Sequence, residues 1–80
     1  MFKPAAALWI DAHQQKRLDQ LIWSGKTPQK IVLRARIVLL ASQGVPNNAI
    51  SHQVRASRPT VLLWRGRFAL SGVPGLLRER

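Results

Sequence analysis

Proline and glycine residues divide this chain into short segments, and within each segment the apolar residues recur at helical spacing. The sequence has no strand-like alternation of apolar and polar residues and no internal repeats. Because the chain has only 80 residues, it can bury one modest core. The pattern therefore predicts an all-α fold, a small domain of four helices around a single apolar cluster.

The first two predicted helices occupy residues 10–24 and 28–43, and each is followed by a glycine. Thr27 is the expected N-cap of the second helix, and Pro28 suits its first turn. In both segments the apolar residues that recur with helical period are expected to face the core. These residues are Leu18, Leu21, Ile22, Ile31, Ala35, Val38 and Leu39.

Two further helices are predicted on either side of a short turn, "RAS", at residues 55–57. Pro46 or Asn47 opens the first of them, which is about two turns long. Ser57 is the expected N-cap of the second, and Gly72 ends it. The residues expected to face the core from this pair are Ile50, Val54, Val61, Trp64 and Phe68.

Two short helices joined by a turn of three or four residues, with arginines on the second, are typical of a helix-turn-helix. In that arrangement the second helix enters the major groove of DNA. Thirteen Lys and Arg residues against three acids give the chain a net charge of +10. A charge this large indicates a polyanionic partner, so double-stranded DNA is the favoured one and an anionic membrane surface comes second.

The candidate DNA contacts lie in the turn and along the last helix. Arginine suits them because its planar fork bonds guanine O6 and N7 together or clamps a phosphate. Bases are read near the start of a recognition helix, so the first positions are expected to contact base edges or nearby phosphates and the later ones the backbone. The candidates are Arg55, Ser57, Arg58, Thr60, Arg65 and Arg67.

Arg34 and Arg36, in the second predicted helix, lie off its inward stripe. They are second-rank candidates for phosphate contact, and a solvated basic face explains them at least as well. Gly66 lies in the middle of the last helix, where it either permits close approach of DNA or is a tolerated small residue.

Several stretches together resemble a known family. "LRARIVLLASQG", "NNAISHQV" and "SRPTVLLWRGRFALSGVPGLL" occur in this order within residues 18–80. In this order they are similar to the N-terminal DNA-binding region of bacterial insertion-sequence transposases of the mariner-related superfamily. The resemblance implies a homeodomain-like fold that recognises terminal inverted repeats. It also implies a separate downstream domain with three acidic metal ligands, and this chain is expected to stop before that domain.

Two residues depart from the pattern of that family, which usually has alanine and glycine where this chain has Ser51 and Arg55. The family's glycine favours a turn with positive φ. An arginine in that conformation costs about 1 kcal/mol. The departure therefore predicts either a reshaped turn or a decaying copy of the family's domain.

Catalytic chemistry is not expected from this chain. Its acids, Asp11, Asp19 and Glu79, have the spacing of surface charges rather than that of a convergent metal site. His13 and His52 lack the spacing of a metal pair, and the absence of cysteine excludes thiolate ligands and disulfides. No phosphate-binding loop or nucleophile motif is present. We expect no enzyme activity, cofactor, metal or small-molecule ligand.

The expected organisation is a flexible arm at residues 1–8, a helical DNA-binding domain at 9–71 and a C-terminal linker or tail at 72–80. The helix-turn-helix is expected at about 47–71. The resemblance implies a bacterial, cytoplasmic and nucleoid-associated protein, and we expect neither a signal peptide nor a membrane span from the sequence. One alternative is a stand-alone regulator, which would need a dimer surface; a weak homodimer is left open. Another is a membrane-active peptide based on "IVLRARIVLLA", which is disfavoured because its two arginines do not share one narrow polar face.

Overall fold

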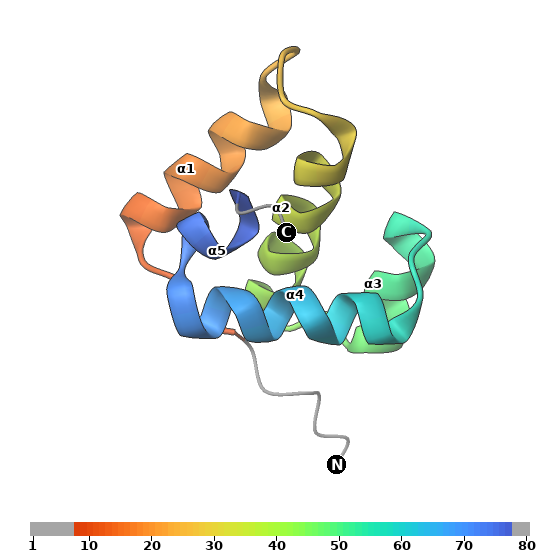
Figure 1. The fold of residues 1–80 in the computed structure, drawn as a ribbon. Coiled ribbons are helices and arrows are strands. Elements are labelled where there is room, and N and C mark those ends of the chain that lie inside the picture. Colours follow the sequence, from red (N-terminus) through yellow and green to blue (C-terminus); the bar gives the residue numbers. More distant parts are fainter. Residues whose placement is uncertain (1–7, 78–80) are drawn as a thin grey trace.

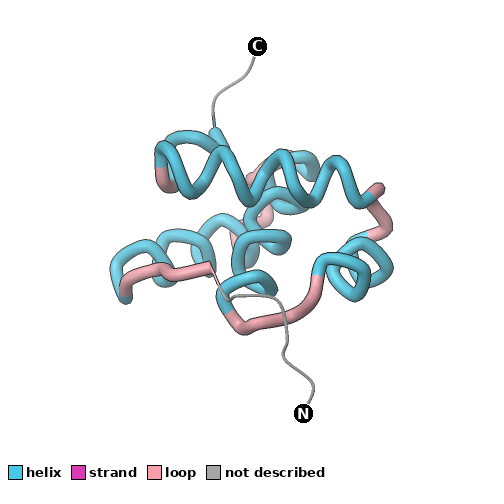
Figure 2. Tube along the Cα trace, turned by 90° about the horizontal axis from the view of Figure 1, so that it is seen from below, coloured by secondary structure: helices cyan, strands magenta, loops and turns pink. Residues whose placement is uncertain are grey.

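The computed structural model describes residues 8–77, and these form five α-helices (Figure 1). Seen from below in Figure 2, the described part of the chain consists of helices and connecting loops. The predicted all-α class is confirmed. The helices are α1 (Ala12–Trp23), α2 (Gln29–Ser42), α3 (Asn47–Val54), α4 (Arg58–Ser71) and α5 (Val73–Leu77).

The first helix begins with a reciprocal cap. The Asp11 carboxylate accepts a hydrogen bond from the Gln14 backbone N–H at 2.7 Å, and the Asp11 N–H donates to Gln14 Oε1 at 3.1 Å. This capping box satisfies backbone donors that would otherwise lack partners, and the negative charge suits the helix N-terminus. Asp11 is therefore a capping residue.

The second helix begins later than expected, because Pro28 occupies the N-cap position. The Pro28 carbonyl accepts hydrogen bonds from the N–H groups of Ile31 and Val32, at 3.0 and 3.1 Å. The prediction of Thr27 as the cap was wrong by one residue. Proline fits here because its fixed φ matches the observed −56°.

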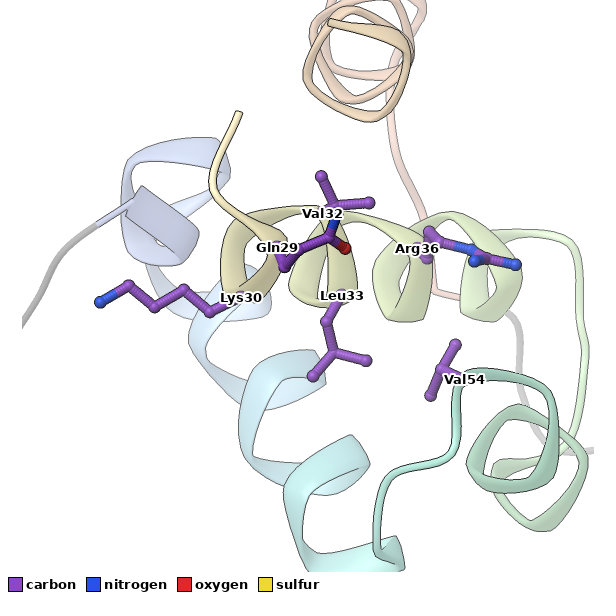
Figure 3. A pocket seen from close by; sticks show the side chains of 6 residues that line it. All are labelled: Gln29, Lys30, Val32, Leu33, Arg36 and Val54. Carbon is purple, nitrogen blue, oxygen red and sulfur yellow. The ribbon is translucent and has the colours of Figure 1, made fainter. Parts of the chain in front are cut away.

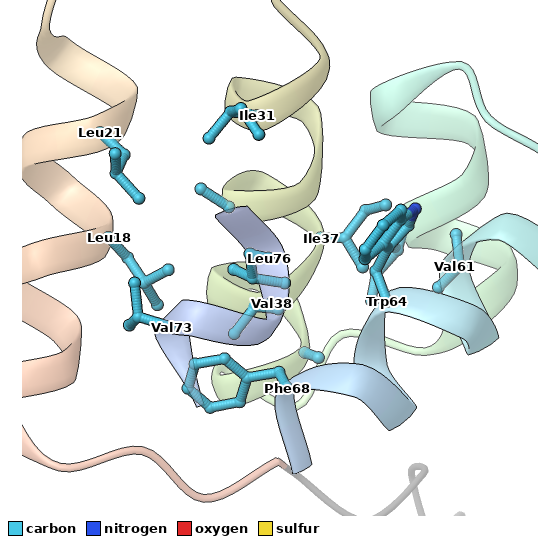
Figure 4. Close-up of a cluster of buried hydrophobic side chains, with 13 residues drawn as sticks. Leu18, Leu21, Ile31, Ile37, Val38, Val61, Trp64, Phe68, Val73 and Leu76 are labelled. Atoms are coloured by element: carbon cyan, nitrogen blue, oxygen red, sulfur yellow. The ribbon is translucent and has the colours of Figure 1, made fainter. Parts of the chain in front are cut away.

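The hydrophobic core surrounds α2, which packs against each of the other four helices. Figure 4 shows side chains from α1, α2, α4 and α5 converging on one cluster. Because neighbours cover α2 on several sides, Ile37 and Ala41 are fully buried in addition to the predicted stripe, whereas Leu39 is only half-buried. The buried hydrophobic residues are Leu18, Leu21, Ile31, Ala35, Ile37, Val38, Ala41, Ile50, Val61, Trp64, Phe68, Val73 and Leu76.

The C-terminal segment departs from the expected linker or tail at residues 72–80. Residues 73–77 form α5, and Val73 and Leu76 are buried in the core. Gly72 ends α4 with φ +69°, and Gly75 lies against α4 so closely that an added Cβ would be 2.8 Å from the Arg67 carbonyl oxygen. The two glycines allow the chain to reverse and pack tightly, so the helical domain extends past residue 71. Residues 78–80 of the expected tail lie outside the described residues.

The expected arm, residues 1–8, is also mostly outside the described part of the chain. Its last residue, Leu8, donates a backbone hydrogen bond to the Ala41 carbonyl at 3.1 Å and packs partly against the core. Trp9, the next residue, has 76% of its surface exposed. The contact at Leu8 ties the start of the described chain to the end of α2.

Candidate nucleic-acid interface

The turn between α3 and α4 contains a left-handed residue. Arg55 has φ 59° and ψ 45°, and it is the only non-glycine residue with positive φ between residues 8 and 77. The Ser51 carbonyl accepts hydrogen bonds from the N–H groups of Arg55 and Ala56, the latter at 3.1 Å, and the Ser51 hydroxyl donates to the Ala56 carbonyl. The turn is therefore not reshaped. Its left-handed residue is an arginine, and the hydroxyl of Ser51 adds a bond that alanine could not make.

The N-terminus of α4 carries three of the predicted contact residues. Ser57 is the N-cap, as predicted: its Oγ accepts from the Thr60 N–H at 3.3 Å and shares a hydrogen bond with Thr60 Oγ1 at 2.9 Å. Arg58, between them, is exposed. The two hydroxyls thus have a structural role as a cap, and the side chain best placed to reach outward is Arg58.

Arg65 is tied to the preceding helix. Its Nη1 donates a hydrogen bond of 2.7 Å to Oδ1 of Asn47, in the first turn of α3. A hydrogen bond from a charged donor is stronger than a hydrogen bond between neutral groups. The bond from Arg65 to Asn47 joins the two helices of the helix-turn-helix. Asn47 was not singled out from the sequence as a partner, because 18 residues separate it from Arg65.

Arg67 and Arg34 lie against the same tryptophan ring. Their guanidinium carbons are 5.3 Å and 4.0 Å from the centroid of Trp64, within the range of a cation–π contact. Arg34 Nη1 also donates a 2.9 Å hydrogen bond to the Leu76 carbonyl. Arg34 therefore connects α2 with α4 and α5, a packing role that neither sequence interpretation of this residue included.

The remaining surface of α4 is largely apolar. Arg58 is the only charged side chain among the exposed residues of this helix. Gly66 is exposed as well, and an added Cβ would meet nothing within 4 Å, so packing does not require glycine there. The exposed residues are Arg58, Pro59, Leu62, Leu63, Gly66, Ala69, Leu70 and Ser71.

A shallow groove separates α2 from the end of α3. Figure 3 shows Leu33 of α2 and Val54 of α3 directed into the space between the two helices, with Lys30 and Arg36 extending to either side. Arg36 is exposed, as the sequence predicts. The groove adds two cations to the positive surface next to the turn. It is lined by Gln29, Lys30, Val32, Leu33, Arg36 and Val54.

The residues from 8 to 77 contain neither a metal-binding group of side chains nor a membrane-spanning helix. Between residues 8 and 77, no group of three His, Cys, Asp or Glu side chains is arranged to hold a metal ion. No helix in this part of the chain is long and apolar enough to cross a membrane. The absence of enzyme activity stays a prediction.

The geometry of α3, the turn and α4 defines a helix-turn-helix, the class of DNA-binding unit predicted from the sequence. Comparison with known protein families matches residues 28–77 to the homeodomain-like domain. The match covers more than half of the chain, so the protein belongs to the homeodomain-like family, and it is a helix-turn-helix DNA-binding domain. No curated protein and no solved structure matches the chain.

Proposed function

We propose that this protein recognises the terminal inverted repeats of an insertion sequence, as the DNA-binding domain of a transposase. The partner is double-stranded DNA of a defined sequence. The role is recognition, and no chemical step is assigned to these residues.

The order of the sequence motifs carries this proposal. An "RARI" helix, an "SRPTV" helix start, a "WRGRF" segment and a Gly-x-x-Gly-Leu ending follow one another along the chain. Several of these motif residues also have packing roles in the fold. Arg34 and Trp64 contact each other, and Gly72, Gly75 and Leu76 build the turn and packing of α5.

The proposed mechanism is noncovalent. Exposed arginines and lysines displace counterions from the DNA phosphates, and the first turn of α4 approaches the bases in the major groove. Arg58 is the residue assigned to base reading, because it is exposed at the start of that helix. Arg55 and Arg36 are assigned to phosphates on either side of the turn.

The test is a fluorescence anisotropy titration of the 80-residue chain with two duplexes. One carries the inverted repeat that flanks the coding region in genomic DNA, and the other is a scrambled duplex of the same composition. We expect a clear preference for the repeat. With the two phosphate contacts assigned to Arg55 and Arg36, the affinity should fall on the order of tenfold between about 50 and 200 mM salt.

Equal, salt-sensitive binding to both duplexes would contradict the proposal and leave a nonspecific DNA-binding domain. Cooperative binding of two chains to a palindromic DNA site other than the inverted repeat would instead favour a stand-alone regulator. A dimer with two-fold symmetry binds two half-sites that are related by the same symmetry. Sedimentation of the complex separates these outcomes, because it reports how many chains bind each duplex.

A further inference from the structure

The outward surface of α4 contains a row of residues spaced four apart, which places them along one strip of the helix. The row consists of Arg58, Leu62, Gly66 and Leu70, and Leu63 lies next to it. Leu62, Leu63 and Leu70 expose 50%, 45% and 89% of their surfaces. After Arg58, this strip therefore offers aliphatic groups and no side-chain hydrogen-bond donor.

The arginines that follow on α4 lie on its two flanks. Arg65 and Arg67 are two residues apart, which separates them by about 160° around the helix. Arg65 is bonded to Asn47 on one side, and Arg67 stacks on Trp64 on the other. The apolar strip lies between these cations. Because both arginines are half-buried and engaged within the fold, the outward surface of α4 beyond Arg58 is mainly aliphatic.

We propose that Leu62, together with Leu63, contacts the 5-methyl groups of thymines in the major groove, beside the base that Arg58 reads. The thymine methyl is the apolar group that base edges present in that groove. A leucine at this position selects thymine because it buries the methyl group. A polar side chain would instead select a base by hydrogen bonding. The inference rests on the sequence-specific DNA binding proposed above.

Charge identifies the occupant of the strip as DNA rather than a second copy of the chain. The strip begins at Arg58 and belongs to a protein with a net charge of +10. A second copy would bring two sets of like charges together, at a cost in free energy, whereas DNA neutralises them. The glycine in the middle of the row leaves room for the backbone to approach the groove floor.

The experiment removes methyl groups from the DNA and leaves the protein unchanged. A preferred duplex is first selected from a random pool with the full chain. Each thymine in it is then replaced singly by deoxyuridine, which deletes the 5-methyl group and keeps base pairing. Burying one methyl group contributes about 0.8 kcal/mol, so the critical replacements should weaken binding about fourfold.

Leu62→Ala is the matching protein variant. It should bind the thymine duplex about as weakly as the wild-type chain binds the deoxyuridine duplex, and the penalty for deoxyuridine at the thymine that Leu62 contacts should disappear. Leu70→Ala is the control, because Leu70 is exposed in the last turn of α4, away from the end that reads bases. This control should keep the full penalty for deoxyuridine. Circular dichroism checks that both variants fold.

Three results would overturn the inference. If deoxyuridine at every thymine of the preferred duplex left the affinity unchanged, the methyl contact would be excluded, and the inverted-repeat proposal would be unaffected. Equal binding to all duplexes would remove both, because no base is read. The sedimentation coefficient of the protein without DNA could also increase with protein concentration. If Leu62→Ala abolished that increase, the strip would be assigned to self-association. A selected duplex unrelated to the inverted repeats would contradict only the proposed function, and its thymines would still decide the methyl contact.

Discussion

The arginines around Trp64 and those around the turn occupy opposite kinds of environment. Arg34 and Arg67 are half-buried with their guanidinium groups over the indole ring. Arg55 and Arg58 are exposed at the junction of α3 and α4. All four were candidate DNA contacts in the sequence, yet only the second pair is exposed to solvent.

The difference shows that the positions of arginines in the sequence do not by themselves identify the residues that contact DNA. An arginine next to an aromatic ring contributes its stem and its flat cation to packing. An arginine in the turn contributes mainly charge and reach. Substitutions should therefore divide into those that lower the stability of the fold and those that lower DNA binding.

The largest effect is expected for Trp64→Ala. Trp64 is 9% exposed and is the ring against which both packing arginines lie. Its loss should lower the free energy of unfolding by about 3 to 5 kcal/mol, a large part of the stability of a domain this size. Thermal denaturation followed by circular dichroism measures it. An unchanged melting curve would show that the ring is not part of the core, and Trp64→Phe should lose less.

Arg34→Ala should have the next largest effect. It removes a hydrogen bond from a charged group to the Leu76 carbonyl and the closer cation–π contact. The expected loss is about 2 to 3 kcal/mol of stability, since a hydrogen bond from a charged group contributes about 1.5 to 3. Urea denaturation measures it. Arg36→Ala is the matched control, because Arg36 is an exposed arginine on the same helix and should change stability by less than about 0.5 kcal/mol.

Arg58→Ala should leave stability almost unchanged and reduce discrimination between DNA sequences by about 1 to 3 kcal/mol. Anisotropy titrations against specific and scrambled duplexes measure the difference. Arg67→Ala should instead lower the stability of the fold, because Arg67 packs against Trp64, and any loss of affinity should be the same for all sequences. If the two variants lost affinity equally for both duplexes, base reading by Arg58 would be excluded.

Arg55→Gly should have the smallest effect. Glycine removes the cost of the left-handed conformation at φ 59° but loses more conformational entropy on folding. The net gain in stability should be about 1 kcal/mol or less, with a modest loss of DNA affinity as one charge is removed.

Ser51→Ala, which deletes the hydroxyl bond to Ala56, should cost about 1 kcal/mol. A gain in stability from Ser51→Ala would contradict the role given to that hydroxyl.

Much of this architecture could be predicted because the relevant interactions are local. Ser57 caps α4, and Val61, Trp64 and Phe68 face the core, as their spacing indicates. The helix-turn-helix follows from the same local rules. The prediction of Thr27 as the N-cap of α2 and the prediction of a C-terminal tail were wrong. A short segment rich in proline and glycine has the sequence pattern of a turn, and residues 73–77 become helical because they pack against the core.

By itself, the sequence determined the all-α class, the limits of most helices and the excess of positive charge, all of which depend on residues close together in the chain or on composition. Only the tertiary structure decided which arginines face the solvent, that residues 73–77 form α5, and that Asn47 holds Arg65. The physical reason is the same in each case. Burial and hydrogen bonds between residues such as Arg34 and Leu76, 42 positions apart, depend on how the helices pack.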